Sequence, residues 1–208
     1  MNIKWLLTAA GLLLATLQLT AQIHFTESFE NPTSTWVGYF TGNVDFPSGT
    51  WEFNAVFPEQ SSNSYDGSKA CRINDDVVGA NITTPAVNTV GSVSFYYHRP
   101  FSGTGEFILQ KSIGGGPFIN LDTVDFSSVS SVNVAALYTF DVNDGNNNIR
   151  IRVMNDDNTA HLAIDLFEVT EFATSGPDIP DGFTAFPSNS TRIDLSATAN
   201  TSGDSVMI

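Results

Sequence analysis

SVSFYYHR, residues 92–99, alternates apolar and polar side chains at every second position. NIRIRVM, residues 148–154, repeats this pattern, with branched apolar residues on one face and arginines on the other. Successive side chains of an extended chain point to opposite faces, so each stretch has one apolar and one polar face. The alternation predicts antiparallel strands that pack against a core on one face only.

Short runs rich in Phe, Val, Ile, Tyr and Thr follow one another through the chain, separated by turn signals such as PSG, YDGS and GGGP. No stretch after residue 22 keeps helical apolar spacing through three turns. The strands expected from this pattern cover residues 22–30, 36–41, 49–57, 68–74, 79–84, 91–99, 104–112, 117–123, 134–140, 147–154 and 160–172. Strands of this length and spacing predict an all-β fold, an antiparallel jelly-roll β-sandwich.

Composition divides the chain into four segments. Residues 1–21 have a short polar start, an apolar run and the sequence LTA before Gln22, as expected of a secretory signal peptide. Residues 22–173 carry the predicted sandwich, residues 174–182 are the predicted linker, and residues 183–208 are too few to bury a core of their own. We therefore expect a secreted or outer-cell-surface protein without a transmembrane anchor after signal cleavage, an uncleaved anchor being the alternative.

The charge balance restricts the expected partners. The chain has 22 Asp and Glu residues against 8 Lys and Arg residues, a formal net charge of −14. Because binding to polyphosphate relies on clustered Lys and Arg, nucleic acid and anionic membranes are not expected partners. Cys71 is the only cysteine, so no disulfide can form within the chain, and its strand parity predicts a buried thiol without a catalytic role.

The C-terminal segment contains a proline, the short apolar strand FTA and the stretch STRIDLSATANTSGDSVMI, all within residues 178–208. This order resembles the first two strands of a fibronectin type III module. Ala197 stands where the second strand of such a module normally has a core tryptophan. The resemblance implies a truncated second β domain, an incomplete fibronectin type III-like start whose parent continues past Ile208.

Three short motifs carry a second resemblance: ESFEN…TW near the start of residues 22–172, DGSKACRI in the middle and AIDLFEV at the end. They resemble exported jelly-roll modules of Bacteroidetes-type surface proteins, which are similar to MAM-like and carbohydrate-binding sandwiches. In such relatives the Glu of FE and the Asp of ID lie on neighbouring strands beside a structural calcium ion. The resemblance therefore implies calcium near Glu30 and Asp165.

At the start of the predicted sandwich, a carboxylate lies on the same face of a strand as two aromatic side chains. Glu27 shares strand parity with Phe25 and Phe29, and Asp165 shares parity with Phe167 near the other end. A carboxylate among apolar neighbours must be paired, protonated or bound to a cation. The first and last strands of a jelly roll commonly lie side by side, and calcium would relieve the repulsion between two carboxylates there.

The candidate calcium ligands are Glu27, Glu30, Asp66, Ser68 and Asp165. Strand parity favours Glu27 as the core-facing carboxylate, whereas the family resemblance favours Glu30, and the sequence does not decide between them. The alternative to calcium is that one of these glutamates meets Arg72 or Lys69 at a sheet edge, or faces water at a bulge.

The polar faces of two strands carry the candidate ligand-binding residues. Tyr96 and His98 lie on the polar face of one strand, and Arg150 and Arg152 lie on that of another. If these strands adjoin, they form one patch suited to stacking on sugar rings and bonding hydroxyl or acidic groups. A polysaccharide or glycan is then the predicted partner. The alternative is an ordinary solvated sheet face with cross-strand pairs.

Sequence motifs give no support for catalysis. The chain has no Gly-x-Ser-x-Gly elbow, no His-Glu-x-x-His motif and no paired cysteines. The predicted function is a non-catalytic secreted or cell-surface binding module, calcium-stabilised and glycan-binding. Two alternatives stay open: an accessory N-terminal domain of an extracellular hydrolase, a nuclease or protease, and an adhesin spacer segment.

Overall fold

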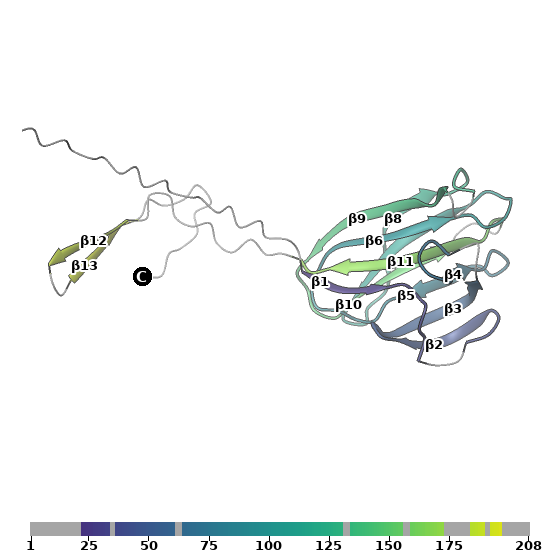
Figure 1. Ribbon diagram of the computed structural model, residues 1–208, viewed down its shortest axis with the longest axis horizontal. Coiled ribbons are helices and arrows are strands. Elements are labelled where there is room, and N and C mark those ends of the chain that lie inside the picture. The colour runs from purple at the N-terminus through teal and green to yellow at the C-terminus, as the bar shows by residue number, and fades with distance from the viewer. Residues whose placement is uncertain are drawn as a thin grey trace, which may run out of the picture.

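The computed structural model of the chain describes residues 22–33, 36–60, 64–130, 134–155, 159–172, 184–189 and 192–196. The regular elements in these ranges are β-strands, and the strands before residue 172 form an antiparallel sandwich (Figure 1). The all-β antiparallel prediction is confirmed. The predicted signal peptide, residues 1–21, and the predicted linker, residues 174–182, lie outside the described residues.

Each predicted strand overlaps a strand of the sandwich. In chain order these are β1 (Ile23–Glu27), β2 (Phe40–Phe46), β3 (Gly49–Gln60), β4 (Lys69–Ile73), β5 (Asn81–Thr83), β6 (Val90–His98), β7 (Glu106–Ile113), β8 (Ile119–Asp125), β9 (Ala136–Asp144), β10 (Ile149–Asn155) and β11 (Leu162–Thr170). The main shift is at β2, expected over residues 36–41. Trp36 instead anchors a loop before the strand, because its buried indole donates a hydrogen bond to the carbonyl of Val56 at 3.2 Å.

The strands form two layers that face each other across the core. One layer has the order β8-β7-β10-β5-β3-β2, and the other has the order β3-β4-β11-β6-β9 with β1 also beside β11. Strand β3 belongs to both layers, since residues 52–54 pair with β5 and residues 56–60 pair with β4. Ala55, between these two segments, has a positive φ of 54°, an uncommon conformation for a residue with a side chain. It marks the bend that carries β3 from one layer to the other.

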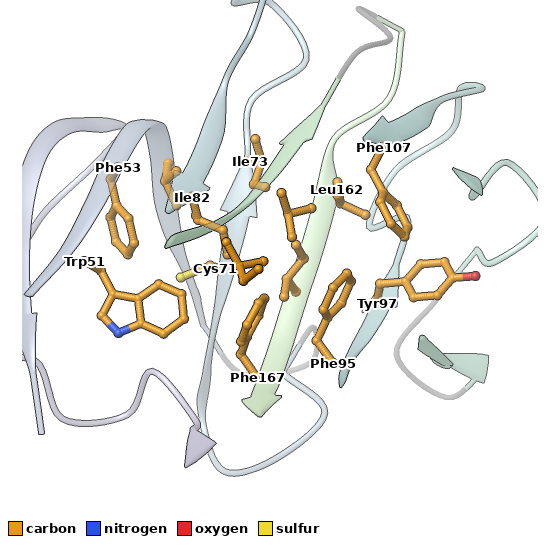
Figure 2. Packing of buried hydrophobic residues seen from close by; sticks show 14 of the residues in the cluster. Trp51, Phe53, Cys71, Ile73, Ile82, Phe95, Tyr97, Phe107, Leu162 and Phe167 are labelled. Atoms are coloured by element: carbon orange, nitrogen blue, oxygen red, sulfur yellow. The ribbon is translucent and has the colours of Figure 1, made fainter. Parts of the chain in front are cut away.

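Aromatic side chains fill the space between the layers (Figure 2). The ring of Phe95 on β6 lies 5.5 Å from that of Phe107 on β7, across the layers, and stacks on Phe167 of β11 at 5.2 Å. Trp51 of β3 is fully buried and meets Phe167 edge-on at 5.3 Å. Cys71 is buried in the same core, as predicted, and burial raises the pKa of its thiol well above the ordinary value. This thiol therefore packs as a small apolar group.

The first and last strands of the sandwich pair antiparallel, as predicted. Ile23 of β1 lies opposite Thr170 of β11. Just beyond this pair, the N–H of Glu171 donates to the carbonyl of Gln22 at 2.6 Å. The two ends of the sandwich are therefore joined by main-chain hydrogen bonds.

Strand β11 contains a bulge that changes which of its residues face the core. Between Asp165 and Glu168, β11 has one more residue than the segment of β6 with which it pairs. Leu166, inside this interval, has a positive φ of 49°. Ile164 and Phe167, three positions apart, both belong to the core. The bulge thus reverses the strand parity of β11 partway along its length.

Strands β12 (Thr184–Asn189) and β13 (Arg192–Ser196) pair antiparallel in a sheet of their own. They match the strand-like pieces expected in residues 183–208. Ala197 and the residues after it lie outside the described part of the chain, so the fibronectin type III-like start stays a prediction. In the residues that the structure describes, no helix combines the length and hydropathy needed to cross a bilayer.

Phe95→Ala should lower the free energy of unfolding by about 3–5 kcal/mol, because it removes a fully buried ring that contacts both layers. Urea unfolding followed by tryptophan fluorescence measures the loss. Leu137→Ala is the matched control: Leu137 lies on the neighbouring strand β9 with 56% of its surface exposed, so the change should stay within about 0.5 kcal/mol. Equal losses in the two variants would contradict this description of the core.

Candidate functional site

Glu27 is the core-facing carboxylate, as strand parity predicts. It is only 4% exposed and lies opposite Phe167 of β11. Its Oε1 accepts the N–H of Phe29 at 2.9 Å, and its Oε2 accepts the hydroxyl of Ser48 at 2.6 Å. Ser48 in turn accepts the indole N–H of Trp51 at 2.9 Å. A buried carboxylate needs such donors, and here the main chain and a serine supply them.

Glu30 holds residues 64–69, the loop before β4 together with the first residue of that strand; we call this segment loop 64–69. Its Oε1 accepts the N–H groups of Ser68 and Lys69, each at 2.6 Å, and its Oε2 accepts the hydroxyl of Ser68 at 2.8 Å. Burial acts to raise the pKa of Glu30, but the hydrogen bonds from Lys69 and Ser68 outweigh it and leave the pKa below its ordinary value. Gly67 has a φ of +64°, and a Cβ there would lie 2.5 Å from Oε1 of Glu30, so the loop requires glycine at this position.

Asp165 holds the same loop from β11. Its Oδ2 accepts the N–H groups of Tyr65 and Asp66, each at 2.8 Å, and its Oδ1 accepts the N–H of the next residue at 2.7 Å. Burial raises the pKa of Asp165 to about 6, against the lowering effect of these three donors. Glu30 and Asp165 therefore fix the main chain of the loop between two carboxylates.

The structure corrects the parity prediction for Asp165. The bulge in β11 places this residue opposite Tyr96, on the face turned away from the core, whereas Glu27 points into the core. The two carboxylates therefore do not face each other between the layers. The family resemblance, which favours Glu30, identifies the carboxylate that shares loop 64–69 with Asp165.

The candidate calcium ligands occupy these positions without forming one cluster. Within the described ranges, no group of three or more His, Cys, Asp or Glu side chains is placed to hold a metal ion. Calcium takes six to eight oxygen ligands, as a rule several from carboxylates. The carboxylate oxygens of Glu30 and Asp165 instead accept N–H and O–H groups of the protein, so this arrangement does not fit the ion. Calcium binding stays a prediction from the sequence.

The four predicted ligand-binding residues do not form one patch, because their strands do not adjoin. Strand β6 pairs with β11 and β9, whereas β10 pairs with β7 and β5. Tyr96 and His98 therefore lie on the outer side of one layer, and Arg150 and Arg152 lie on the outer side of the other. Alternation predicts which face of a strand is polar but not which strands are neighbours.

Tyr96 and His98 are both covered by other parts of the protein. The ring of Tyr65 stacks on that of Tyr96, with centroids 3.6 Å apart and planes inclined by 12°. His98 is 2% exposed, and burial lowers its pKa to about 4, so its imidazole is neutral at pH 7. Its Nε2 has no hydrogen-bond partner among the described residues. His98 is therefore buried and does not present its ring to a ligand.

Arg152 belongs to a row of polar side chains that crosses the outer face of its layer. Cross-strand register connects six residues on six neighbouring strands: Asn43, Glu52, Thr83, Arg152, Gln110 and Asn120. We call these six residues the polar row. Neighbouring strands lie about 4.8 Å apart, so five intervals extend for roughly 24 Å. Asn43 and Asn120, at the two ends, are exposed, whereas Thr83 and Gln110, near the centre, are buried.

The two arginines of β10 are held by different partners. The guanidinium carbon of Arg152 lies 3.4 Å from the ring centroid of Phe118, and its Nε donates to the hydroxyl of Thr83 at 3.3 Å. Arg150 forms an ion pair with Glu52 at 2.9 Å. Stacking on an aromatic ring fixes the plane of a guanidinium while its edge can still donate hydrogen bonds. Phe118 is not among the predicted site residues. The sequence predicts it within a strand, residues 117–123, whereas in the structure it lies just before β8.

Gln110 places an acceptor beside Arg152. Its Nε2 donates to Oδ1 of Asn120 at 2.8 Å, whereas its Oε1 is buried and has no hydrogen-bond partner among the residues that the structure describes. A buried acceptor without a partner costs about 1–3 kcal/mol. Because this oxygen is fully buried, a ligand hydroxyl could supply the missing donor only after the neighbouring side chains move aside.

Aromatic side chains also surround Arg72, the alternative partner for the N-terminal glutamates. The guanidinium carbon of Arg72 lies between 4.6 and 5.5 Å from three ring centroids, those of Tyr39, Phe57 and Phe101. The ring of His161 packs against Tyr39 and Phe101 as well. We call these five residues the loop-end cluster. Tyr39 and Phe101 are 42% and 50% exposed.

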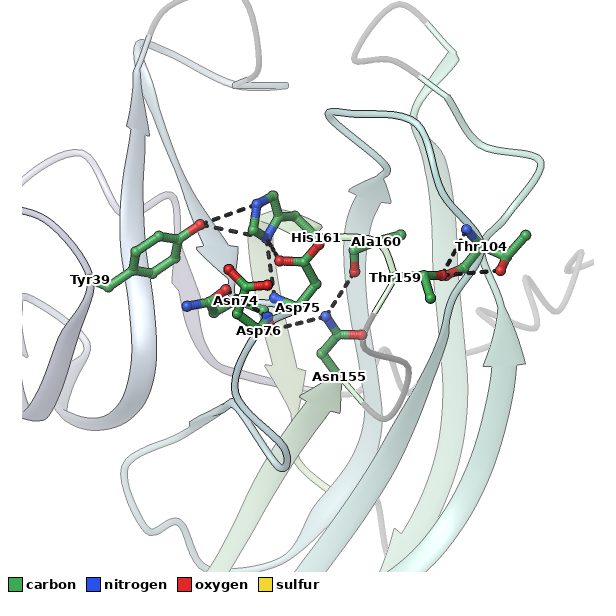
Figure 3. Close-up of polar contacts among 9 residues, drawn as sticks. All are labelled: Tyr39, Asn74, Asp75, Asp76, Thr104, Asn155, Thr159, Ala160 and His161. Atoms are coloured by element: carbon green, nitrogen blue, oxygen red, sulfur yellow. Dashed lines mark hydrogen bonds and ion pairs between the residues drawn. The ribbon is translucent and has the colours of Figure 1, made fainter.

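Hydrogen bonds tie the loops beside this cluster together (Figure 3). His161 Nδ1 lies 2.8 Å from Oδ1 of Asp75 and accepts the N–H of the same residue at 3.1 Å. The buried amide of Asn155 donates to the carbonyls of Asn74 and Ala160 at 3.0 and 2.9 Å. These contacts assign the loop-end cluster a structural role, joining the segment after β4 to the segment before β11. The other alternative partner, Lys69, donates from Nζ to the main-chain carbonyl of Glu30 at 3.2 Å.

Comparison with known proteins supports the fold. No protein-family model and no curated protein matches the chain. Among solved structures, the chain is similar to the CBM22-1 and GH10 modules of Clostridium thermocellum endo-1,4-β-D-xylanase 10B complexed with xylohexaose. The TM-score is 0.50 and the sequence identity is 12%. The match covers 77% of this chain and 30% of the xylanase chain. It is also similar to the K2 cleaved adhesin domain of Lys-gingipain, with a TM-score of 0.50 and 14% identity over 70% of this chain and 98% of that one.

A further likeness is to the CBM22-1 xylan-binding domain of Paenibacillus barcinonensis Xyn10C, with a TM-score of 0.49 and 13% identity over 74% of this chain and 97% of that one. The chain spans less than a third of the length of the xylanase chain. Together with the strand order, the likenesses at a TM-score of 0.50 show a jelly-roll β-sandwich.

The raised pKa of Asp165 predicts how stability depends on pH. Between its ordinary pKa of 3.8 and about 6, the folded protein retains a proton that the unfolded chain releases. The contribution of this group to the free energy of unfolding therefore falls as the pH rises through that window. The stability difference between the natural protein and Asp165→Ala should shrink by about 2 kcal/mol from pH 4 to pH 6. Urea unfolding at a series of pH values measures this difference.

Glu30→Ala is the control, because the contribution of Glu30 to stability should depend on pH in the opposite direction. The pKa of Glu30 is lowered, so its contribution is present above its ordinary pKa of 4.5 and is lost as the pH falls through its folded-state value. If the difference for Asp165→Ala instead grew as the pH rose, the pKa of Asp165 would be lowered by folding, contrary to this prediction.

Thermal melting tests calcium. Because protein donors already bind the carboxylates of Glu30 and Asp165, we expect the same Tm with a chelator and with millimolar calcium. An ion that binds only the folded state would raise Tm with its concentration. An upward shift on adding calcium that disappears in Glu30→Gln would establish the ion predicted from the sequence and refute the metal-free expectation.

Proposed function

We propose that residues 22–172 form a non-catalytic glycan-binding module that holds a polysaccharide chain along the polar row. The observation that carries this proposal is the row itself: six hydrogen-bonding side chains in register across six strands, with a guanidinium stacked on Phe118 beside its centre. A row of roughly 24 Å has room for several sugar rings.

The chemistry of the row suits hydroxyl groups. Arg152 supplies donors from a fixed plane, and Gln110 supplies a buried acceptor that lacks a donor among the described residues. Each sugar hydroxyl can both donate and accept, so one pyranose can bond to both side chains. Arg150 is neutralised by Glu52, and the chain as a whole carries a net charge of −14. We therefore expect an uncharged polysaccharide, because a polyanion would be repelled.

The two alternatives from the sequence stay compatible with this activity. A sandwich similar to a module of a xylanase supports an accessory role beside a hydrolase, and a sandwich similar to an adhesin domain supports a spacer or attachment role. Both place the module in a secreted or cell-surface protein, as the predicted signal peptide does. We favour polysaccharide binding because it makes use of the side chains of the polar row.

Arg152→Ala and Gln110→Ala should each weaken binding to a neutral polysaccharide by about tenfold, since each removes a hydrogen-bonding group worth roughly 1–2 kcal/mol. Affinity electrophoresis of the full chain in gels containing soluble xylan or β-1,4-galactan measures the retardation. Thr139→Ala, an exposed polar position on β9 in the other layer, is the matched control and should migrate like the natural protein.

Melting curves of all variants separate loss of binding from loss of folding. If the natural protein is retarded and Arg152→Ala is retarded equally, the polar row is not the site. If Tyr39→Ala alone abolishes retardation, the site belongs to the loop-end cluster instead.

A further inference from the structure

The Tyr65–Tyr96 pair lies on the face of the sandwich opposite to the polar row. Tyr96 projects from β6 on the outer side of its layer, and Tyr65 covers it in a nearly parallel stack with centroids 3.6 Å apart. Tyr65 remains 44% exposed. One face of the Tyr65 ring is covered by Tyr96, so solvent reaches the other face and the ring edges. The pair thus presents a flat aromatic surface on top of a sheet.

The loop that carries Tyr65 is fixed independently of the ring. The N–H groups of Tyr65 and Asp66 bind Asp165, and those of Ser68 and Lys69 bind Glu30. Charge-assisted bonds of this kind are shorter and stronger than neutral ones. The ring is therefore held in one place before any ligand arrives, and a ligand that stacks on it does not bear the cost of ordering the loop.

Because these main-chain hydrogen bonds hold the loop, the ring of Tyr65 is not needed to keep the loop in place. The stack on Tyr96 is not needed to close the loop, because Glu30 and Asp165 already bind its main chain at both ends. A large, half-exposed aromatic ring in a fixed position is typical of a recognition surface. Polar and apolar groups lie beside it: Asp66 is exposed, and Leu137, which pairs with Tyr96 across β6 and β9, is 56% exposed.

We infer that Tyr65 is a stacking platform for a pyranose ring, a second sugar-binding position on the face opposite to the polar row. The C–H face of a pyranose packs on the free face of Tyr65, where its ring continues the stack begun by Tyr96. The carboxylate of Asp66 accepts a hydroxyl proton at the edge of that ring, and Leu137 offers apolar contact. The inference rests on the proposed function only in taking a sugar as the ligand, since the two positions share no residue.

Amide NMR titration of the full chain with xylohexaose and with β-1,4-galactotriose tests the platform. Binding should shift the amides of residues 64–69, and Tyr65→Ala should weaken that binding about fivefold or more, the loss expected for one aromatic stacking contact. Tyr65→Phe should stay within about twofold, because the ring and not the hydroxyl makes the contact. Val78→Ala is the control for general loss of apolar surface, because Val78 is 79% exposed and belongs to neither proposed site. Amides far from residues 64–69 should keep their positions in each variant, which shows that the variant is folded.

The outcomes separate this inference from the proposed function. Shifts confined to the polar row would overturn the platform and leave the proposed function in place. Shifts confined to residues 64–69 that disappear in Tyr65→Ala would support the platform and overturn the polar row as the site. Shifts at residues 64–69 that persist unchanged in Tyr65→Ala would overturn stacking on this ring.

Discussion

The bulge in β11 is the constraint on which the rest of the sandwich depends. This strand pairs with β6 on one side and with β4 and then β1 on the other. The additional residue at Leu166 lets Ile164 and Phe167 both pack in the core, while Asp165 turns outward to bind a loop. Without it, either an unpaired carboxylate would enter an aromatic core or Phe167 would leave it. Each change would cost several kcal/mol.

Three acidic side chains near the two ends of the sandwich accept hydrogen bonds from its own main chain. Glu27, Glu30 and Asp165 each accept hydrogen bonds from at least two donors, and most of these donors are backbone N–H groups. Many small exported domains fix their loops with disulfides. Here the single cysteine, Cys71, is buried in the core, and loop 64–69 is fixed by two carboxylates instead. This use of carboxylates explains the charges that the sequence places beside aromatic residues.

Alternation in the sequence predicts the strands and the burial of Glu27 well, because both depend on local periodicity. It fails for Asp165, since a bulge depends on the pairing partner and leaves no mark in a single strand. It also cannot place Arg152 relative to Tyr96, because the order of strands in a sheet is a property of the whole chain. Tyr65 lies in a loop, where no period indicates which way a ring points. Phe118 lies just before β8, although the sequence predicts a strand from residue 117, and the boundary of a strand is not set by its period.

The hydrogen bond between Gln22 and Glu171 has a mechanical consequence. The chain enters and leaves the sandwich at the same end of the paired strands β1 and β11. A force that pulls on both ends of the sandwich therefore acts across this strand pair and not along it. Such a force would separate β1 from β11 one hydrogen bond after another, instead of straining all of them together in shear. The seam between these strands is then the first to open under force. Glu27 and the aromatic core behind it would meet water only after that seam had parted.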